Sequence, residues 1–235
     1  MKLSAPVFIL KQQAKSLARQ EKIPLHQALN RIANREGFRA WSLLAAKVAA
    51  EEPSATLLAQ LNPGDLVLVA ARPGQGKTLL SLDLAIKTMR QGNQAAFFTL
   101  EFTHADVAAC FKTLGEEPSQ FTGRFLFDDS DQICADYIIA RLASAPPKML
   151  VVIDYLQLLD QKRQNPDLAE QVQRLKRFAL ERELIILCLS QIDRSYDPAQ
   201  RAWPEMSDVR LPNPLDLGLF TRKCFLNQGR LHSGS

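Results

Sequence analysis

A short loop with two glycines follows an apolar run and directly precedes a stretch with helical periodicity. Gly74 and Gly76 let backbone N–H groups turn inward around phosphate oxygens, and the following helix adds the positive end of its dipole. Lys77 can reach the β- and γ-phosphates of a nucleotide, and Thr78 can hold Mg²⁺. We therefore expect a nucleotide-binding α/β fold, although Ala71 stands where the strict pattern has Gly. The candidate phosphate-binding loop comprises Ala71, Arg72, Pro73, Gly74, Gln75, Gly76, Lys77 and Thr78.

Short apolar runs alternate with helical stretches from residue 63 onward. Continuous runs of Val, Ile and Leu are typical of strands buried on both faces, and the segments between them are long enough for crossover helices. This order predicts a mostly parallel sheet between helices. A turn at residues 227–229 predicts a late hairpin. The predicted strands are Leu66–Ala71, Ala95–Leu100, Arg124–Phe127, Met149–Asp154 and Leu184–Ser190, and the predicted helices span residues 78–91, 103–114, 131–144 and 165–182.

Three polar side chains stand where predicted strands end. Asp154 closes one run, and a carboxylate at the C-terminal edge of a sheet can bind the magnesium shell of a nucleotide. Glu101 follows a second run, where it can polarise the water that attacks the γ-phosphate. Gln191 follows a third and can sense the γ-phosphate. The alternative for each is a polar residue that marks where a strand meets water.

The basic charge of the chain is concentrated in its first fifty residues. They hold nine Lys and Arg and two Glu, a net charge of +7, whereas the other 185 residues carry a net charge of −3. Such a segment predicts contact with a polyanion such as nucleic acid, and the alternative is a solvated face. Four of the basic side chains form a stripe with helical spacing, namely Lys11, Lys15, Arg19 and Lys22.

The same fifty residues predict a bundle of three short helices, the second of which ends at Gly37. Its aromatic residues are expected to fill a small core, with base stacking as the alternative. The residues expected to face inward are Leu10, Ala14 and Leu17 in the first helix, Leu25, Leu29 and Ile32 in the second, and Phe38, Trp41 and Leu44 in the third.

These features divide the chain into a small basic helical domain (residues 1–50), a linker (51–62) and an ATPase domain (63–235). No apolar stretch approaches the roughly 18 residues that a membrane helix needs, and the start of the chain is unlike a signal peptide. The four cysteines lie far apart without a C-x-x-C motif, which suits neither a disulfide framework nor a zinc site. We expect a cytoplasmic protein with reduced thiols and no membrane partner.

Five segments resemble, in order, the motifs of DnaB-type replicative DNA helicases. They are Asn62–Thr78, Phe98–Phe102, Val152–Leu159, Leu189–Ser195 and Met206–Arg210. The resemblance covers about residues 60–211 and implies a RecA-like P-loop NTPase domain, preceded here by a small all-α segment. In DnaB-type helicases an Ala is familiar at the first position of the phosphate loop, where this sequence has Ala71.

The resemblance implies a role for each candidate site residue. Lys77 and Thr78 become nucleotide ligands, with Lys77 also acting in catalysis. Asp154 becomes the magnesium carboxylate, and Glu101 becomes the catalytic carboxylate. Gln191 becomes the residue that couples the nucleotide to DNA. ATP and Mg²⁺ are the implied cofactors, and single-stranded DNA is the expected partner.

The sequence also departs from the family. Such helicases have a large N-terminal helical domain for hexamer formation and primase contact, where this sequence has its basic fifty residues. They also continue into strands with a Lys-x-Arg pair whose Arg reaches the neighbouring subunit's nucleotide site. Arg222, Lys223 and Arg230 match that pair poorly, so we expect slow turnover and leave homo-oligomer formation open. The alternatives to a helicase are an ATP-binding regulatory switch and a DNA-binding adaptor with a degenerate nucleotide site.

Overall fold

The computed structural model of the chain describes residues 3–5, 7–45, 52–160, 165–197, 200–211 and 213–234. The chain divides into two units, Met1–Thr56 and Leu57–Ser235. The predicted boundary between residues 50 and 51 lies outside the described residues. Within the segment predicted as a linker, the structure has a helix, α4 (Pro53–Leu58), and Leu57 is buried in the core of the second unit.

The first unit contains helices α1 (Val7–Glu21) and α2 (Leu25–Arg35) and a third helical segment, residues 41–45. The expected inward face of α1 is confirmed for Leu10 and Ala14, which are fully buried, and Leu17 packs against them. Phe38 and Trp41 also pack against this cluster, which favours core filling over base stacking.

The prediction for Leu25 was wrong. Its side chain is 43% exposed, because it is the first residue of α2 and lies at the end of that helix. The buried positions of α2 are Ala28, Ile32 and Ala33, while Leu29 is only partly buried.

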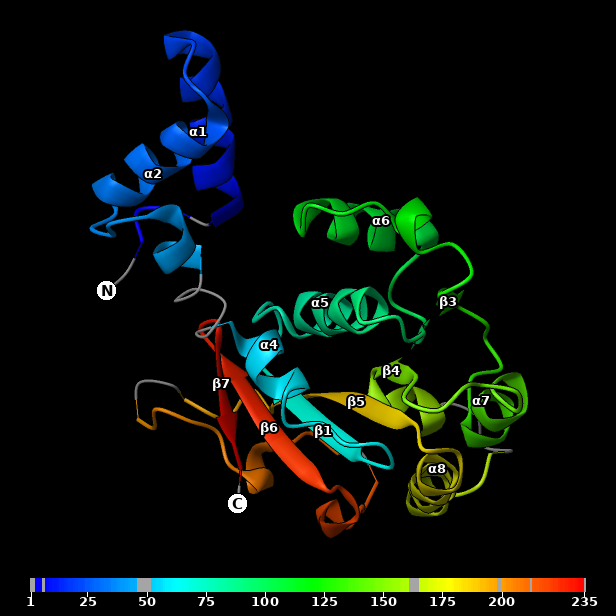
Figure 1. Cartoon of the computed structure of the whole chain (residues 1–235). Helices are drawn as coiled ribbons and strands as arrows, with labels where there is room; N and C mark the ends of the chain where they lie inside the picture. The colour runs from blue at the N-terminus through cyan, green and yellow to red at the C-terminus, as the bar shows by residue number, and fades with distance from the viewer. Residues whose placement is uncertain are drawn as a thin grey trace. The chain divides into compact units, whose positions relative to one another are not determined.

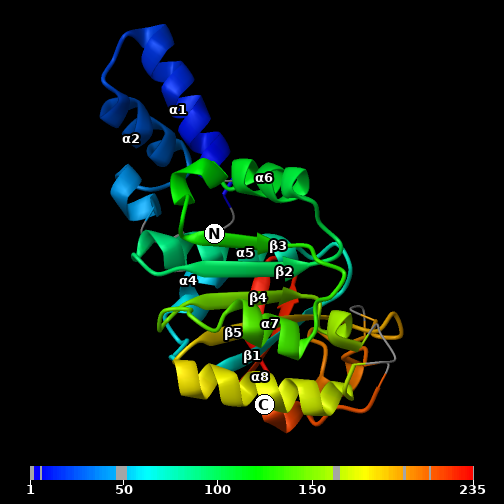
Figure 2. The same ribbon diagram turned by 90° about the vertical axis from the view of Figure 1, so that its right-hand side faces the viewer.

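A seven-stranded sheet forms the centre of the second unit, with the strand order β3-β2-β4-β5-β1-β6-β7. Six strands are parallel, and β7 pairs antiparallel with β6. Figure 2 shows β3, β2, β4, β5 and β1 succeeding one another. The strands are β1 (Leu66–Ala71), β2 (Ala95–Thr99), β3 (Phe125–Asp128), β4 (Leu150–Asp154), β5 (Ile185–Gln191), β6 (Arg222–Asn227) and β7 (Arg230–Ser233).

The five predicted strands are confirmed to within one residue at each end. Side chains alternate between the two faces of a strand, so each face of β1 joins a different core. Leu66 and Leu68 lie in the cluster with α7 and α8, whereas Val67 and Val69 lie in the cluster with α5 and α6. The two helix pairs therefore cover opposite faces of the sheet (Figure 1).

The helices of this unit follow the predicted order. The predicted helix over residues 131–144 is shorter, because the backbone first turns with a hydrogen bond from Ile133 to Ser130. The helices are α5 (Lys77–Arg90), α6 (His104–Thr113), α7 (Ala135–Arg141) and α8 (Leu168–Arg182), and the 3-10 turns are η1 (Pro118–Phe121), η2 (Leu156–Asp160), η3 (Met206–Asp208) and η4 (Leu217–Leu219).

The four cysteines are free thiols. Burial raises the pKa of Cys188 to about 12 and that of Cys224 to about 11, so both remain protonated and unreactive at neutral pH. Among the helices of the described residues, none combines the length and the apolar character that a membrane crossing requires.

Candidate functional site

The predicted phosphate loop connects β1 directly to α5 at the C-terminal edge of the sheet. Gly74 and Gly76 have φ angles of +79° and +85°, in the left-handed region that glycine adopts without strain. A Cβ atom built on either glycine would meet no atom within 4 Å. The loop therefore borders open space on its glycine side, as a phosphate cradle requires.

Asp154 lies beside the first turn of α5. The hydroxyl of Thr78 donates a hydrogen bond of 2.8 Å to Asp154 Oδ2, and the ammonium of Lys77 lies 3.8 Å from Oδ1. Asp154 is fully buried, and its Oδ1 has no hydrogen-bond partner. A buried carboxylate oxygen without a donor, next to a threonine hydroxyl, fits the oxygen ligands that Mg²⁺ prefers.

The surroundings of Asp154 act on its ionisation in opposite directions. Burial raises the pKa of its carboxyl, while the charge of Lys77 and the hydrogen bond from Thr78 lower it, with a net increase. The buried charge is thus only partly compensated, which favours a further cation at this position.

Glu101 lies two residues beyond the end of β2, since the strand ends at Thr99 rather than at Leu100. Its backbone N–H donates to the Thr99 hydroxyl at 3.0 Å, which fixes the start of the loop. Partial loss of solvation raises the pKa of the Glu101 carboxyl, Lys77 lowers it and Asp154 raises it. Glu101 therefore lies in the electrostatic field of the other two groups.

Gln191 is the last residue of β5, which lies between β4 and β1. Its strand partner is Ala71, so it stands at the level where the phosphate loop begins. Its backbone carbonyl accepts a 2.8 Å hydrogen bond from the N–H of Arg210. A cavity of about 350 Å³ opens beside it, lined by Pro73, Gln191, Ile192, Asp193, Arg194 and Arg210.

The sheet thus places the loop, Gln191, Asp154 and Glu101 on strands that succeed one another, β1, β5, β4 and β2. Because these strands are parallel, all four features lie at one edge. Sequence reasoning did not single out Arg194 and Arg210 as neighbours of the loop. Both arginines lie in segments that resemble the helicase motifs, Leu189–Ser195 and Met206–Arg210. That resemblance was the sequence signal that could have identified them.

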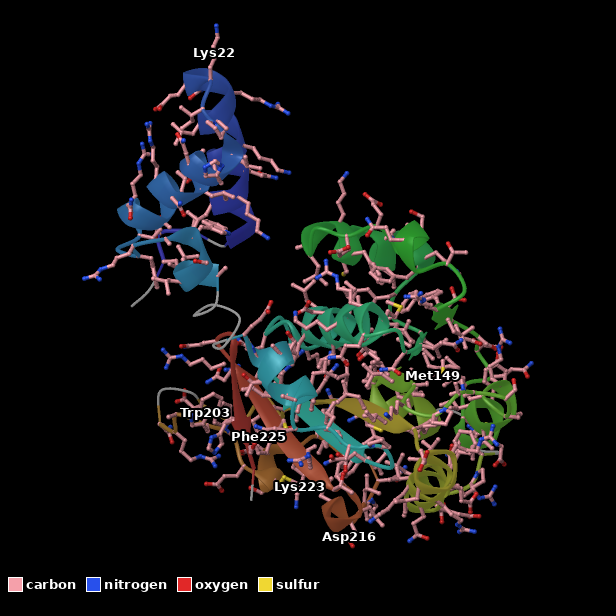
Figure 3. All side chains as sticks on the ribbon, viewed as in Figure 1. Lys22, Met149, Trp203, Asp216, Lys223 and Phe225 are labelled. Atoms are coloured by element: carbon pink, nitrogen blue, oxygen red, sulfur yellow. The ribbon has the colours of Figure 1, made fainter. Side chains whose placement is uncertain are left out.

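The basic stripe belongs to the first unit. Lys11, Lys15 and Arg19 lie on α1, and Lys22 follows its end with a φ of +53°. All four side chains are exposed, and Lys22 projects from the end of the unit (Figure 3). The spacing of the three helical residues puts them on one face of α1.

Comparison with known proteins connects this site to one family. The model of the DnaB-like helicase C-terminal domain matches residues 55–118 and 111–213. The chain is 28% identical over 216 residues to a probable plasmid replicative DNA helicase of Chlamydia muridarum, covering 74% of this chain and 48% of that protein. It is 29% identical over 178 residues to the replicative DNA helicase DnaB of Geobacillus stearothermophilus, covering 62% and 39%. The chain spans less than half the length of these relatives.

Solved structures agree on the fold. A DnaB-like replicative helicase, described together with its interactions with primase, matches with a TM-score of 0.60 and 19% identity over 93% of this chain and 65% of that one. A separately solved ATPase domain matches with a TM-score of 0.58 and 21% identity, over 78% and 81%. A KaiC-like protein of Pyrococcus horikoshii matches with a TM-score of 0.52 and 16% identity, over 69% and 71%. The predicted RecA-like α/β fold is confirmed.

Proposed function

The chain belongs to the DnaB-like helicase C-terminal domain family, and we propose that it hydrolyses ATP with Mg²⁺ and acts on DNA as a helicase-type motor. The observation that carries the proposal is the cluster of Lys77, Thr78 and Asp154 at the end of the phosphate loop. A buried carboxylate that meets a loop lysine and threonine is the arrangement that a nucleotide–magnesium site requires.

In this proposal the loop binds the phosphates and the neighbouring residues serve the transfer. Backbone N–H groups of the loop and the ammonium of Lys77 bind the β- and γ-phosphates and neutralise charge that develops on them. Thr78 and Asp154 would hold Mg²⁺, which supplies further positive charge when bound. Gln191 stands at the same edge, where it can contact the γ-phosphate. Through this contact it can couple the binding of the γ-phosphate to the segment beyond β5.

Glu101 orients the attacking water and accepts its proton. The water oxygen forms a bond to the γ-phosphorus as the bond to the leaving oxygen of ADP breaks, and inorganic phosphate is released. The raised pKa of Glu101, which burial causes, makes its carboxylate a stronger base than that of an ordinary glutamate.

DNA binding and assembly form the second part of the proposal. The exposed stripe of Lys11, Lys15, Arg19 and Lys22 suits the phosphates of single-stranded DNA, and membership of the family supports a homo-oligomer in the cytoplasm. The relatives named above carry replicative helicase names, which supports action on DNA.

One experiment separates a motor from the other candidate roles. ATP turnover is measured with and without single-stranded DNA, and the mass in solution is measured with nucleotide. Turnover that DNA stimulates supports the motor. Tight ATP binding without stimulated turnover would instead identify a regulatory switch, and DNA binding without nucleotide binding would identify an adaptor.

A further inference from the structure

The phosphate loop and the turn of the β6–β7 hairpin leave neighbouring strands at the same level. β1 and β6 are parallel, and Ala71, the last residue of β1, is paired with Leu226. The chain leaves β1 for the phosphate loop directly after Ala71, and β6 ends one residue after Leu226, at Asn227, where the turn follows. Because paired strands lie about 4.8 Å apart, the loop and the turn emerge from the sheet side by side.

A hydrogen bond joins these two segments. The side-chain carbonyl oxygen of Gln75 accepts from the backbone N–H of Gln228 at 2.8 Å. Gln228 and Gly229 both have positive φ angles, +50° and +71°, as a tight two-residue hairpin turn requires. Gln75 stands between Gly74 and Gly76, so this bond holds the loop at the position where its backbone must face a phosphate.

The hairpin is itself anchored on its other side. The Asn227 side chain donates to the carbonyl of Ala202 at 3.1 Å. The rings of Trp203 and His232 stack with centroids 5.0 Å apart and planes 23° apart. Both rings border a cavity of about 540 Å³ that Phe225 also lines, and Figure 3 shows Trp203 and Phe225 close together.

We propose that the β6–β7 hairpin positions the phosphate loop through the hydrogen bond between Gln228 and Gln75. Gln228 is a positioning residue, since it acts on the ligand only through the loop. A loop that is already ordered binds its ligand more tightly, because less conformational entropy is lost on binding. The inference rests on the proposed function in taking a nucleotide as the ligand of the loop.

The test replaces the acceptor and leaves the rest of the hairpin in place. Gln75→Met has a side chain of similar length without the carbonyl oxygen, and Gln75→Glu keeps an oxygen at the same reach. Gln60→Met is the matched control, since Gln60 is an exposed glutamine on a different segment. All variants carry Trp41→Phe, so that Trp203 is the sole tryptophan. Backbone hydrogen exchange of Gln228 and of residues 74–77 and the emission of Trp203 are first measured without nucleotide.

Gln75→Met should speed the backbone hydrogen exchange of Gln228 and of residues 74–77, and it should shift the emission of Trp203. Gln75→Glu should show exchange rates and emission like those of the parent. Titration with ADP and Mg²⁺ should then show about two- to tenfold weaker binding for Gln75→Met, as expected for one neutral hydrogen bond, whereas Gln60→Met binds like the parent. Unchanged loop exchange in Gln75→Met would overturn the proposal. A parent protein that binds no ADP would instead contradict the proposed function, and the exchange data would still decide whether the hairpin orders the loop.

Discussion

The hydroxyl of Thr78 donates a 2.8 Å hydrogen bond to Asp154, although 76 residues separate the two in the chain. Thr78 lies in the first turn of α5, and Asp154 is the last residue of β4. The parallel sheet brings them together, because it aligns the C-terminal ends of β1 and β4 on either side of β5. The same carboxylate lies 3.8 Å from Lys77, so one buried group connects the phosphate loop to the proposed metal site.

Asp154→Asn should stabilise the nucleotide-free protein at neutral pH and remove the extra stability that Mg²⁺ and ATP provide together. Burial raises the pKa of Asp154 above its ordinary 3.8 in the folded state. The folded state therefore favours the protonated carboxyl of Asp154. The contribution of this preference to stability is fully present below pH 3.8, and it is lost as the pH rises through the pKa that Asp154 has in the folded state. An asparagine carries no charge at any pH and still accepts from Thr78.

Thermal unfolding between about pH 4 and pH 8 measures this effect. The advantage of Asp154→Asn over the parent should grow as the pH rises, by about 2–4 °C for each kcal/mol. Asp129→Asn, at an exposed carboxylate, serves as the control and should show no such trend. An advantage that shrinks with rising pH would contradict the assigned direction of the shift.

Lys77→Ala should abolish ATP binding at micromolar concentrations. Without the ammonium, the β- and γ-phosphates face only backbone donors, and the loss of charge-assisted hydrogen bonds costs about two orders of magnitude in affinity or more. Titration calorimetry with ATP and Mg²⁺ measures the affinity. Lys112→Ala, an exposed lysine on α6, should bind as the parent does, and an unchanged affinity of Lys77→Ala would exclude the assigned role.

Glu101→Gln should keep ATP binding and lose turnover by about 10²- to 10⁴-fold, the usual contribution of a general base. Glutamine has nearly the same shape but cannot accept the proton of the attacking water. In the parent, the turnover rate should fall on the acid side with an apparent pKa above 4.5, since the Glu101 pKa is raised. Equal loss of binding in Glu101→Gln and Lys77→Ala would show that Glu101 is a ligand rather than a base.

Periodicity predicted the central strands, because β1, β2, β4 and β5 are apolar runs buried on both faces. β6 and β7 gave a weaker signal. β6 begins with Arg222 and Lys223, and β7 at the edge has mostly exposed side chains, so only the turn at residues 227–229 predicted their hairpin. Leu25 was misplaced because periodicity does not say where along a helix the contact with its neighbour begins.

The residues of the site that local sequence patterns mark could be predicted, whereas the contacts between distant segments could not. Lys77, Thr78 and Asp154 could be named because a loop motif and a strand end are local patterns. The bond from Gln228 to Gln75 spans 153 residues and depends on the register of β1 against β6, which no local pattern fixes. The approach of Arg210 to Gln191 depends likewise on the path of the chain after β5.

The basic stripe on the first unit should give nucleic-acid binding a steep dependence on salt. Lys11, Lys15, Arg19 and Lys22 are all exposed, whereas a different side of α1 packs into the core through Leu10 and Ala14. Changing the four basic residues to Gln therefore leaves the packing intact. Each phosphate contact that is lost should lower the slope of log K against log salt concentration by about 0.7 for a single strand and 0.9 for a duplex.

Fluorescence anisotropy of a labelled single strand between about 50 and 300 mM salt measures the slope, and circular dichroism checks that the helices persist. The control changes Arg31 and Arg35 of α2, also exposed, to Gln. The control removes two charges and the test variant removes four, so the loss of slope is compared per charge removed. A smaller loss per charge in the control would show that position on the stripe matters, because both sets remove basic charge from the same unit. Full removal of residues 1–50 should flatten the dependence further. An unchanged affinity and slope in the fourfold variant would mean that this face of α1 is solvated or contacts a protein, and that any DNA binding arises at the edge of the sheet.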